Sequence, residues 1–328
     1  MKKILVTGGA GYIGSHVAHL LAQRGFVPII YDNLSTGFKD FVEKFDFIEG
    51  DIGDYQRVRN VLESHDIACV MNFASYIAVG ESVSYPLKYY DNNVAKTFTM
   101  FQAMLDTGVN NFIFSSSAAV YGNPDQVPIR EDSRLHPESP YGKTKYFIEE
   151  VLRDLDVSDQ FRSVSLRYFN AAGADPSGEM GEGHVPETHL IPLVIRAVLD
   201  PSYTITIFGT DYDTHDGTCV RDYIHVNDLA MAHILALENL LKEPVTKVYN
   251  LGNGLGFSVK EVIDSVKRVT GKDFSVKEGE RRPGDPAVLV ASSERAQQEL
   301  GWKPVYPDID DIVESAWKWE SQQRRRGY

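Results

Sequence analysis

Cysteine is scarce in this chain, and the few cysteines present are not arranged as a metal site or a disulfide framework. The only two in 328 residues are Cys69 and Cys219, which stand far apart, with no C-x-x-C motif and no cysteine–histidine cluster. Structural zinc sites and disulfide scaffolds both use closely spaced cysteines. The cysteine content therefore argues against a structural zinc site, predicts no bound metal, and is typical of a reducing, cytoplasmic location.

Long apolar runs and an excess of basic residues are also missing. No stretch of 18 apolar residues occurs, and the N-terminus leads straight into a predicted core strand, so we expect neither a transmembrane helix nor a signal peptide. The 33 lysines and arginines are outnumbered by 46 aspartates and glutamates, which gives a net charge of −13. This charge disfavours nucleic acid and anionic membranes as partners. An anionic small substrate is compatible with it if local arginines reverse the field inside a cleft.

Glycine is concentrated in one motif at the start of the chain. The sequence KKILVTGGAGYIG, residues 2–14, places a short apolar strand before Gly8, Gly11 and Gly14. Glycines in such a strand-to-helix turn permit a tight turn, a close approach of the backbone to phosphates, and close packing of the helix, whose N-terminus faces the anion. The next strand ends in Asp32, where a carboxylate would hold a ribose diol and disfavour a 2′-phosphate. The motif predicts an NAD site; the alternative is a structural turn with an incidental aspartate.

Apolar runs of four to eight residues alternate with helical stretches through the first half of the chain. Strands are predicted at 3–7, 27–31, 45–49, 67–73, 111–116 and 163–169, and helices near 13–24, 54–64, 92–107 and 141–155. This alternation predicts an α/β fold with a doubly wound, Rossmann-like parallel sheet covered on both faces. After Asn170 the segment 171–189 is rich in glycine, proline and acidic residues, and predicts a long functional loop. Further elements are predicted as helices at 190–199, 227–241, 258–270 and 310–322 and strands at 203–208 and 219–225.

The length of the chain suits two lobes better than one core. We expect an NAD-binding domain over residues 1–170, to which the segment around 222–252 returns. Residues 171–328 would mainly form a smaller α/β substrate domain.

A tyrosine and a lysine stand four residues apart at the start of a predicted helix, where Tyr141 and Lys145 share one face. A lysine ammonium near a phenol lowers the pKa of the phenol from about 10 towards neutrality, as a general base requires. Among 17 tyrosines this spacing is expected about once by chance, but Ser117 ends an apolar strand 24 residues before Tyr141. Strand ends of such sheets face the ligand crevice. We predict Tyr141 as the acid/base and Ser117 as a hydrogen-bond partner of a substrate oxygen; the alternative for Ser117 is a strand-end turn.

Several motifs in order resemble the extended short-chain dehydrogenase/reductase family. They are GGAGYIG at 8–14, Asp32, NFA at 72–74, NNV at 92–94, SSSAAVYG at 115–122, SPYGKTK at 139–145 and RYFN at 167–170. Within this family, DGTCVRDYIHVNDLAMAH at 216–233 and RRPGDPA at 281–287 look like the branch that epimerises UDP-sugars at C4. The resemblance covers essentially the whole chain. It implies an NAD-dependent isomerase that interconverts UDP-glucose and UDP-galactose through a 4-keto intermediate, and a homodimer.

The resemblance also implies the site residues. For NAD, they are Gly8, Gly11, Tyr12, Ile13 and Gly14 at the pyrophosphate, Asp32 and Asn33 at the adenosine ribose, Asp51 and Ile52 at the adenine, Lys145 at the nicotinamide ribose, and Phe73, Ala74, Asn93, Tyr141 and Tyr168 along the rest of the cofactor. For the UDP-sugar, they are Ser117, Tyr141, Asn170, His189, Leu190 and Leu289 near the sugar, Phe208 beside uracil, Arg221 and Arg282 at the diphosphate, and Asp285 at the uridine ribose.

Three positions depart from the family pattern. Ile77 replaces the usual lysine on the cofactor side, and His189 replaces an asparagine that often contacts substrate. Leu289 stands where a bulky tyrosine in some members blocks N-acetylated sugars, so a UDP-N-acetylhexosamine or UDP-pentose is an alternative substrate. A sugar-nucleotide 4,6-dehydratase is a less favoured alternative, because Ala118 and Ala119 follow Ser117 where dehydratases usually place Asp-Glu. A non-catalytic NAD-binding protein is the alternative from another class.

Overall fold

Seven parallel strands form the main sheet of the computed structural model, which describes residues 1–158, 161–282 and 285–326. The strand order is β11-β6-β5-β4-β1-β2-β3, and every ladder is parallel. The strands are β1 (Lys3–Thr7), β2 (Val27–Asp32), β3 (Asp46–Glu49), β4 (Ile67–Asn72), β5 (Asn111–Ser117), β6 (Arg162–Tyr168) and β11 (Lys247–Leu251). The order reverses between β1 and β4, which is where such sheets bind ligands at their carboxyl edge.

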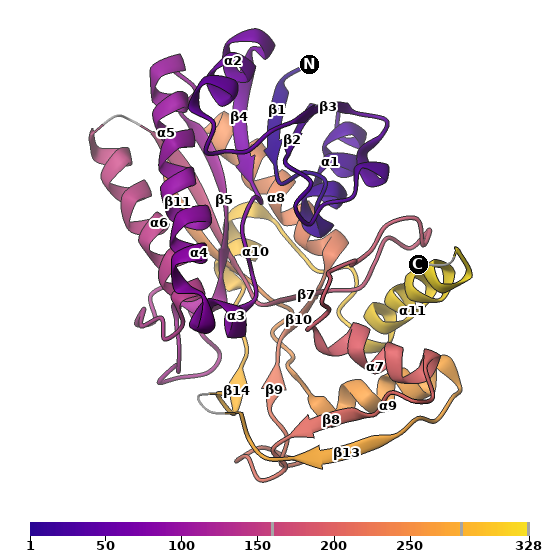
Figure 1. The fold of residues 1–328 in the computed structure, drawn as a ribbon. Helices are drawn as coiled ribbons and strands as arrows, with labels where there is room; N and C mark the ends of the chain where they lie inside the picture. The colour runs from indigo at the N-terminus through magenta and orange to yellow at the C-terminus, as the bar shows by residue number, and fades with distance from the viewer. Residues whose placement is uncertain (159–160, 283–284, 327–328) are drawn as a thin grey trace.

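Helices cover both faces of this sheet, as Figure 1 shows. Because successive strand residues point to opposite faces, Ile4 and Val6 join the core beneath α1 (Tyr12–Gln23) and α8 (Val226–Lys242). Leu5 belongs instead to the core beneath α2, α5 and α6. These three helices span Tyr55–His65, Lys96–Thr107 and Pro140–Ser158. The predicted doubly wound parallel sheet is thereby confirmed.

A second, smaller lobe has its own apolar core, and lies below the sheet in Figure 1. It contains the helices α7 (Leu190–Leu199), α9 (Val259–Thr270) and α11 (Ile309–Arg326) and the parallel pair β8 (Ile205–Phe208) and β13 (Val276–Gly279). Short strands join the lobes: β7 (Asn170–Ala172) pairs with β10 (Tyr223–His225), and β9 (Val220–Arg221) lies between β12 (Phe257–Ser258) and β14 (Val288–Leu289). The loop predicted at 171–189 is confirmed over 173–189, which contains no helix or strand, whereas Ala171 and Ala172 belong to β7.

The sequence did not predict all elements. The expected strand at 219–225 is divided at Asp222, whose buried carboxylate accepts backbone N–H groups of Asn253, Gly254 and Ala291, so β9 and β10 enter different sheets. Strand β11 and helices α3 (Val79–Ser84), α4 (Pro86–Tyr90) and α10 (Glu294–Leu300) were not predicted. A π-helical turn over Asp91–Ala95 precedes α5, which starts later than expected. Within the described ranges, no helix combines the length and apolar character that a membrane span requires.

Candidate active site

The glycine turn between β1 and α1 is closely packed on one side and open on the other. Gly8 has a φ of +69°, and a Cβ there would lie 2.5 Å from the backbone nitrogen of Ala74. A Cβ on Gly14 would lie 2.8 Å from Gly9 Cα. A Cβ on Gly11 would have only the Gly8 carbonyl oxygen nearby, at 3.2 Å. Two of the glycines are thus required by packing, and the surface above the third is free for a phosphate to approach the start of α1.

Polar groups at the carboxyl ends of β2 and β3 lie beside this turn. The Asp32 carboxylate accepts the backbone N–H groups of Ala10 at 2.9 Å and Leu34 at 2.8 Å, and its burial raises its pKa. Asp51 accepts a hydrogen bond from Asn33 at 3.0 Å and an ion pair from Lys96 at 2.8 Å. Although burial opposes it, these bonds lower the pKa of Asp51. The acidic residues predicted for the adenosine end are therefore fixed in place, with Ile52 buried next to Asp51.

The segment after β4 forms the opposite wall of the turn. The backbone of Phe73 and Ala74 packs against Gly8, and the Ala74 N–H donates to Asn72 Oδ1 at 3.1 Å. Asn93, within the π-helical turn, uses its side-chain amide on both backbone groups of Tyr76, at 2.9 and 3.0 Å. Its contribution in this structure is to hold the 73–76 segment in position.

Ser117, Tyr141 and Lys145 meet where β5 ends and α6 begins. The Ser117 side chain lies close enough to the Tyr141 phenol to lower its pKa. Lys145 is buried, and its ammonium donates to the carbonyl oxygen of Ser115 at 2.8 Å, 5.8 Å from the centre of the Tyr141 ring. Tyr168 extends this group, because its hydroxyl hydrogen-bonds the Ser115 hydroxyl. The structure thus brings the three predicted catalytic side chains together at the carboxyl edge of the sheet.

The prediction that Lys145 lowers the pKa of the Tyr141 phenol is wrong for this structure, in which that pKa is raised. Burial raises the pKa of Tyr141 above its usual value of about 10, and only the hydrogen bond from Ser117 lowers it. Burial also lowers the pKa of Lys145 to about 7. The ammonium is directed at the Ser115 carbonyl and is desolvated, so it does not acidify the phenol by itself. A positive charge closer to the phenol than that of Lys145 would lower the pKa of Tyr141.

A second group of predicted residues lies on the short strands and the smaller lobe. The Arg221 guanidinium pairs with Asp285, and Leu289 is the partner of Arg221 in the β9–β14 ladder. The Arg282 guanidinium lies 4.2 Å above the ring of Phe208 at the end of β8. Among the contacts of the described residues, none joins these side chains directly to Ser117 or Tyr141. Positions 283 and 284 of the 281–287 motif lie outside the described residues.

The remaining predicted residues lie where the chain crosses between the lobes. Asn170 donates its side-chain amide to the Asp222 carbonyl at 2.9 Å. His189 precedes α7, which begins at Leu190, and its Nδ1 lies 2.8 Å from carboxylate oxygens of both Glu182 and Glu187. Although burial opposes it, these carboxylates raise the pKa of His189 to about 10. Ile77 is partly exposed in the loop before α3.

A buried polar network behind the catalytic residues was missed by sequence reasoning. Glu149, eight residues after Tyr141 on α6, accepts the Ser116 hydroxyl at 2.5 Å and pairs with Arg167 of β6 at 2.6 Å. Arg167 also donates to the hydroxyl of Tyr121 at 2.8 Å, which donates to Asn250 of β11 at 2.6 Å. The four-residue spacing of Tyr141, Lys145 and Glu149 was the available signal, since it places all three on one helix face.

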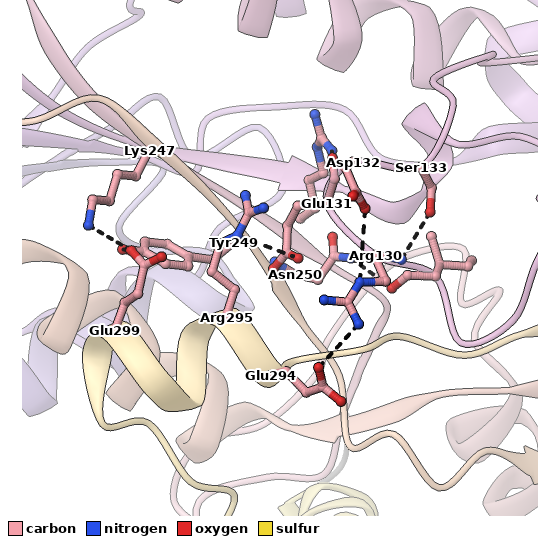
Figure 2. A network of polar contacts seen from close by, with 12 residues as sticks. Arg130, Glu131, Asp132, Ser133, Lys247, Tyr249, Asn250, Glu294, Arg295 and Glu299 are labelled. Atoms are coloured by element: carbon pink, nitrogen blue, oxygen red, sulfur yellow. Dashed lines mark hydrogen bonds and ion pairs between the residues drawn. The ribbon is translucent and has the colours of Figure 1, made fainter.

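Figure 2 shows how this network continues towards the surface. The Asn250 backbone N–H donates to Glu131, whose other carboxylate oxygen lies 3.9 Å from Arg295 of α10. Lys247 of β11 pairs with Glu299 of α10 at 2.6 Å. These contacts hold the segment after β5 against the edge strand β11.

Comparisons with known proteins match this arrangement. Residues 4–252 match the sequence model described as the NAD dependent epimerase/dehydratase family. The chain is 50% identical over 326 residues to the UDP-glucose 4-epimerase of Rhizobium meliloti (strain 1021), covering 99% of each protein. It is also similar to the crystal structure of UDP-glucose 4-epimerase from Brucella ovis in complex with NAD, with a TM-score of 0.94, 47% identity, and 96% and 97% coverage. A Stenotrophomonas maltophila UDP-glucose-4-epimerase with bound NAD and formylated UDP-arabinopyranose gives a TM-score of 0.96, 40% identity, and 99% and 100% coverage.

Proposed function

Since the chain belongs to the NAD dependent epimerase/dehydratase family, we propose that it is an isomerase that interconverts UDP-glucose and UDP-galactose at C4, with NAD as its cofactor. The observation that carries this proposal is the meeting of Ser117, Tyr141 and Lys145 at the carboxyl edge of the sheet, where the Lys145 ammonium lies 5.8 Å from the Tyr141 ring centre. The glycine turn and Asp32 suit NAD, because the turn is open at Gly11 and the carboxylate is fixed beside it.

The chain's own residues handle the proton. When bound, NAD supplies a hydride acceptor for C4 and a positively charged ring, a charge of the kind that lowers the pKa of a phenol. Ionised Tyr141 takes the proton of the sugar 4-hydroxyl, and Ser117 hydrogen-bonds the same oxygen. After the 4-keto sugar rotates to present the opposite face of C4 and is reduced there, Tyr141 returns the proton to the new hydroxyl. Because the oxidation and the reduction at C4 cancel, the reaction would consume no external oxidant or reductant.

Anchoring of the nucleotide explains how the sugar can rotate within the site. Arg221 and Arg282 are suited to diphosphate oxygens, and Phe208 offers a partly exposed ring for the base. Binding energy placed on the UDP group leaves the hexose few fixed contacts, which permits its rotation. The local arginines also offset the acidic background charge.

A 4,6-dehydratase is not favoured by the residues that follow Ser117. Elimination needs an additional acid and base beside the sugar. The two residues that follow Ser117 are alanines, Ala118 and Ala119, in a short helical turn. Alanine has no carboxylate, so these positions supply neither the acid nor the base.

The proposal is tested by incubating purified protein with UDP-galactose without added NAD and separating the C4 epimers. We expect UDP-glucose to form until the two sugars reach equilibrium, with no accumulation of NADH. Absence of UDP-glucose even when NAD is supplied, or stoichiometric NADH release, would contradict epimerisation.

Leu289 determines whether N-acetylated sugars enter, as we infer from its position opposite Arg221 and its packing against the apolar cluster formed by Val120, Tyr121 and Ile129. We expect the chain to epimerise UDP-N-acetylgalactosamine as well as UDP-galactose. Leu289→Tyr should lower the rate with the N-acetylated sugar at least about tenfold, because it fills the space of the acetyl group, and change the rate with UDP-galactose less than about threefold. Leu289→Met, which conserves volume, is the matched control. Equal losses with both sugars would exclude this role.

We also propose a homodimer formed through α5 and α6. Phe98 and Phe147 are exposed by 37% and 48%, and their ring centres lie 6.0 Å apart on neighbouring helices. Sedimentation should give twice the chain mass of 36.7 kDa, and Phe147→Glu should give the monomer mass because a charge enters the apolar contact. A wild-type monomer at micromolar concentration would refute the dimer.

The remaining assignments follow from the same function. We propose residues 1–170, with the segment around 222–252, as the NAD-binding domain and the rest of 171–328 as the UDP-sugar domain. We further propose a cytoplasmic role in galactose metabolism, supported by two cysteines that are both free thiols.

A further inference from the structure

Four metal-ligating side chains gather at the end of the loop between β7 and α7. They are Glu182, His184, Glu187 and His189, and their ligand atoms all lie within 4.8 Å of one another. We propose that this cluster binds one divalent transition-metal ion, and that Zn²⁺ is the ion its donor atoms fit. The sequence-based expectation of no metal considered cysteine ligands and gave no weight to this histidine–glutamate pattern.

The donor atoms already converge. Oε1 of Glu182 lies 3.0 Å from Nδ1 of His184 and 2.8 Å from Nδ1 of His189, which is also 2.8 Å from Oε1 of Glu187. A tetrahedral zinc ion with bonds of about 2.0–2.2 Å spaces its ligand atoms roughly 3.3–3.6 Å apart. These three pairs would need to separate by about half an ångström to admit the ion, which replaces the hydrogen shared by each histidine and carboxylate, and the other pairs already lie within 4.8 Å.

The charge of the cluster also favours a cation. Glu182 is buried, and among the described residues the ion pairs of Glu182 and Glu187 are with histidines alone. Glu320 of α11 is a third carboxylate close enough to interact with both. Buried carboxylates require a compensating charge, and a divalent ion supplies it once the histidines are neutral ligands.

The donor types select among cations. Magnesium and calcium take sets of oxygen ligands, whereas two imidazole nitrogens with two carboxylates are a donor set that zinc accepts. Four protein ligands with no open position indicate a structural site and not a catalytic one.

The bound ion would fasten the loop to the segments that it packs against. The Glu182 carbonyl accepts the indole N–H of Trp319 at 2.7 Å, and a Cβ on Gly183 would lie 2.8 Å from the ring of Phe38. At the other end of the loop, the Tyr12 hydroxyl donates to the Gly173 carbonyl at 2.6 Å. All four ligands lie within eight residues, so the chelate forms locally and ties the start of α7 to this packed segment.

The test measures zinc binding to the full-length chain, independently of activity. Protein freed of metal with EDTA is titrated with zinc against a chromophoric chelator, and the metal content is measured by mass spectrometry. We expect one zinc per chain and a higher Tm with zinc than with EDTA. His184→Ala and Glu187→Gln should each weaken zinc binding at least about tenfold, because each removes one ligand.

His65→Ala is the matched control, since His65 also lies beside a carboxylate, 3.6 Å from Asp46, on α2. Circular dichroism shows whether each variant is folded. If His184→Ala does not fold, Glu187→Gln still tests the proposal. Wild-type binding of less than about 0.1 zinc per chain at micromolar free zinc would overturn the proposal. Unchanged affinity in the folded ligand variants, or an equal loss in His65→Ala, would also overturn it.

Discussion

Replacing Tyr141 by phenylalanine is expected to lower kcat for UDP-galactose at least about a hundredfold, the usual contribution of a positioned acid/base. The substitution removes the phenol oxygen that bonds Ser117 and leaves the buried ring in place. Because the proposed nucleotide anchors, Arg221 and Arg282, are unchanged, KM should change less than kcat. Steady-state rates of C4 epimerisation, measured with the bound NAD content of each preparation, give the result.

Tyr146→Phe is the control for this variant. Tyr146 lies on the same helix and packs against the cluster of Val120, Tyr121 and Ile129, away from the catalytic hydrogen bond. Its substitution should leave kcat within about threefold of the wild-type value. Near-normal turnover by Tyr141→Phe would remove Tyr141 from the acid/base role.

Replacing Arg167 by methionine is expected to lower the free energy of unfolding by about 3–5 kcal/mol, because the buried Glu149 carboxylate then keeps only its longer, 3.8 Å ion pair with the half-exposed Arg153. Both Arg167 and Glu149 have side chains that are at most 2% exposed, and they are joined by bonds of 2.6 and 2.9 Å. Denaturant unfolding of the two proteins at pH 7 measures the difference.

The pH dependence of this loss has a defined sign. In the variant, the buried Glu149 carboxylate keeps only the Ser116 hydroxyl and the 3.8 Å ion pair with Arg153. The loss of stability is therefore expected to be largest at neutral pH, where this carboxylate is charged, and smaller in acid, where protonation removes the buried charge. The double variant Glu149→Leu/Arg167→Met should recover much of the stability, since no charge stays buried. A cost below about 1 kcal/mol for Arg167→Met would show that the pair does not support the fold.

The parts of the structure that sequence predicted well are those with strong local signals. The strand before Gly8 is continuously apolar, and the glycine spacing has few other physical uses, so β1, α1 and the position of Asp32 could be predicted. Ser117 and Tyr141 were predicted to meet because a strand end and a helix start share the carboxyl edge of a parallel sheet.

The parts that sequence missed depend on contacts between distant segments. Strand β11 is short, and it becomes a strand by pairing with β6. The pKa directions of Tyr141 and Lys145 follow from burial, which the four-residue spacing does not report. Glu149 of α6 pairs with Arg167 of β6, 18 residues further along the chain. The pairing depends on how α6 packs on β6, which the local sequence does not report.

The central claim is that Tyr141 carries the proton of the 4-hydroxyl while bound NAD would supply the redox chemistry at C4, so that C4 would keep its own hydrogen through epimerisation. UDP-galactose deuterated at C4 tests this most directly when it is incubated with the purified chain without added cofactor. The account predicts UDP-glucose that retains the deuterium at C4, at full enrichment. UDP-glucose in which the deuterium has been replaced by solvent hydrogen would contradict it.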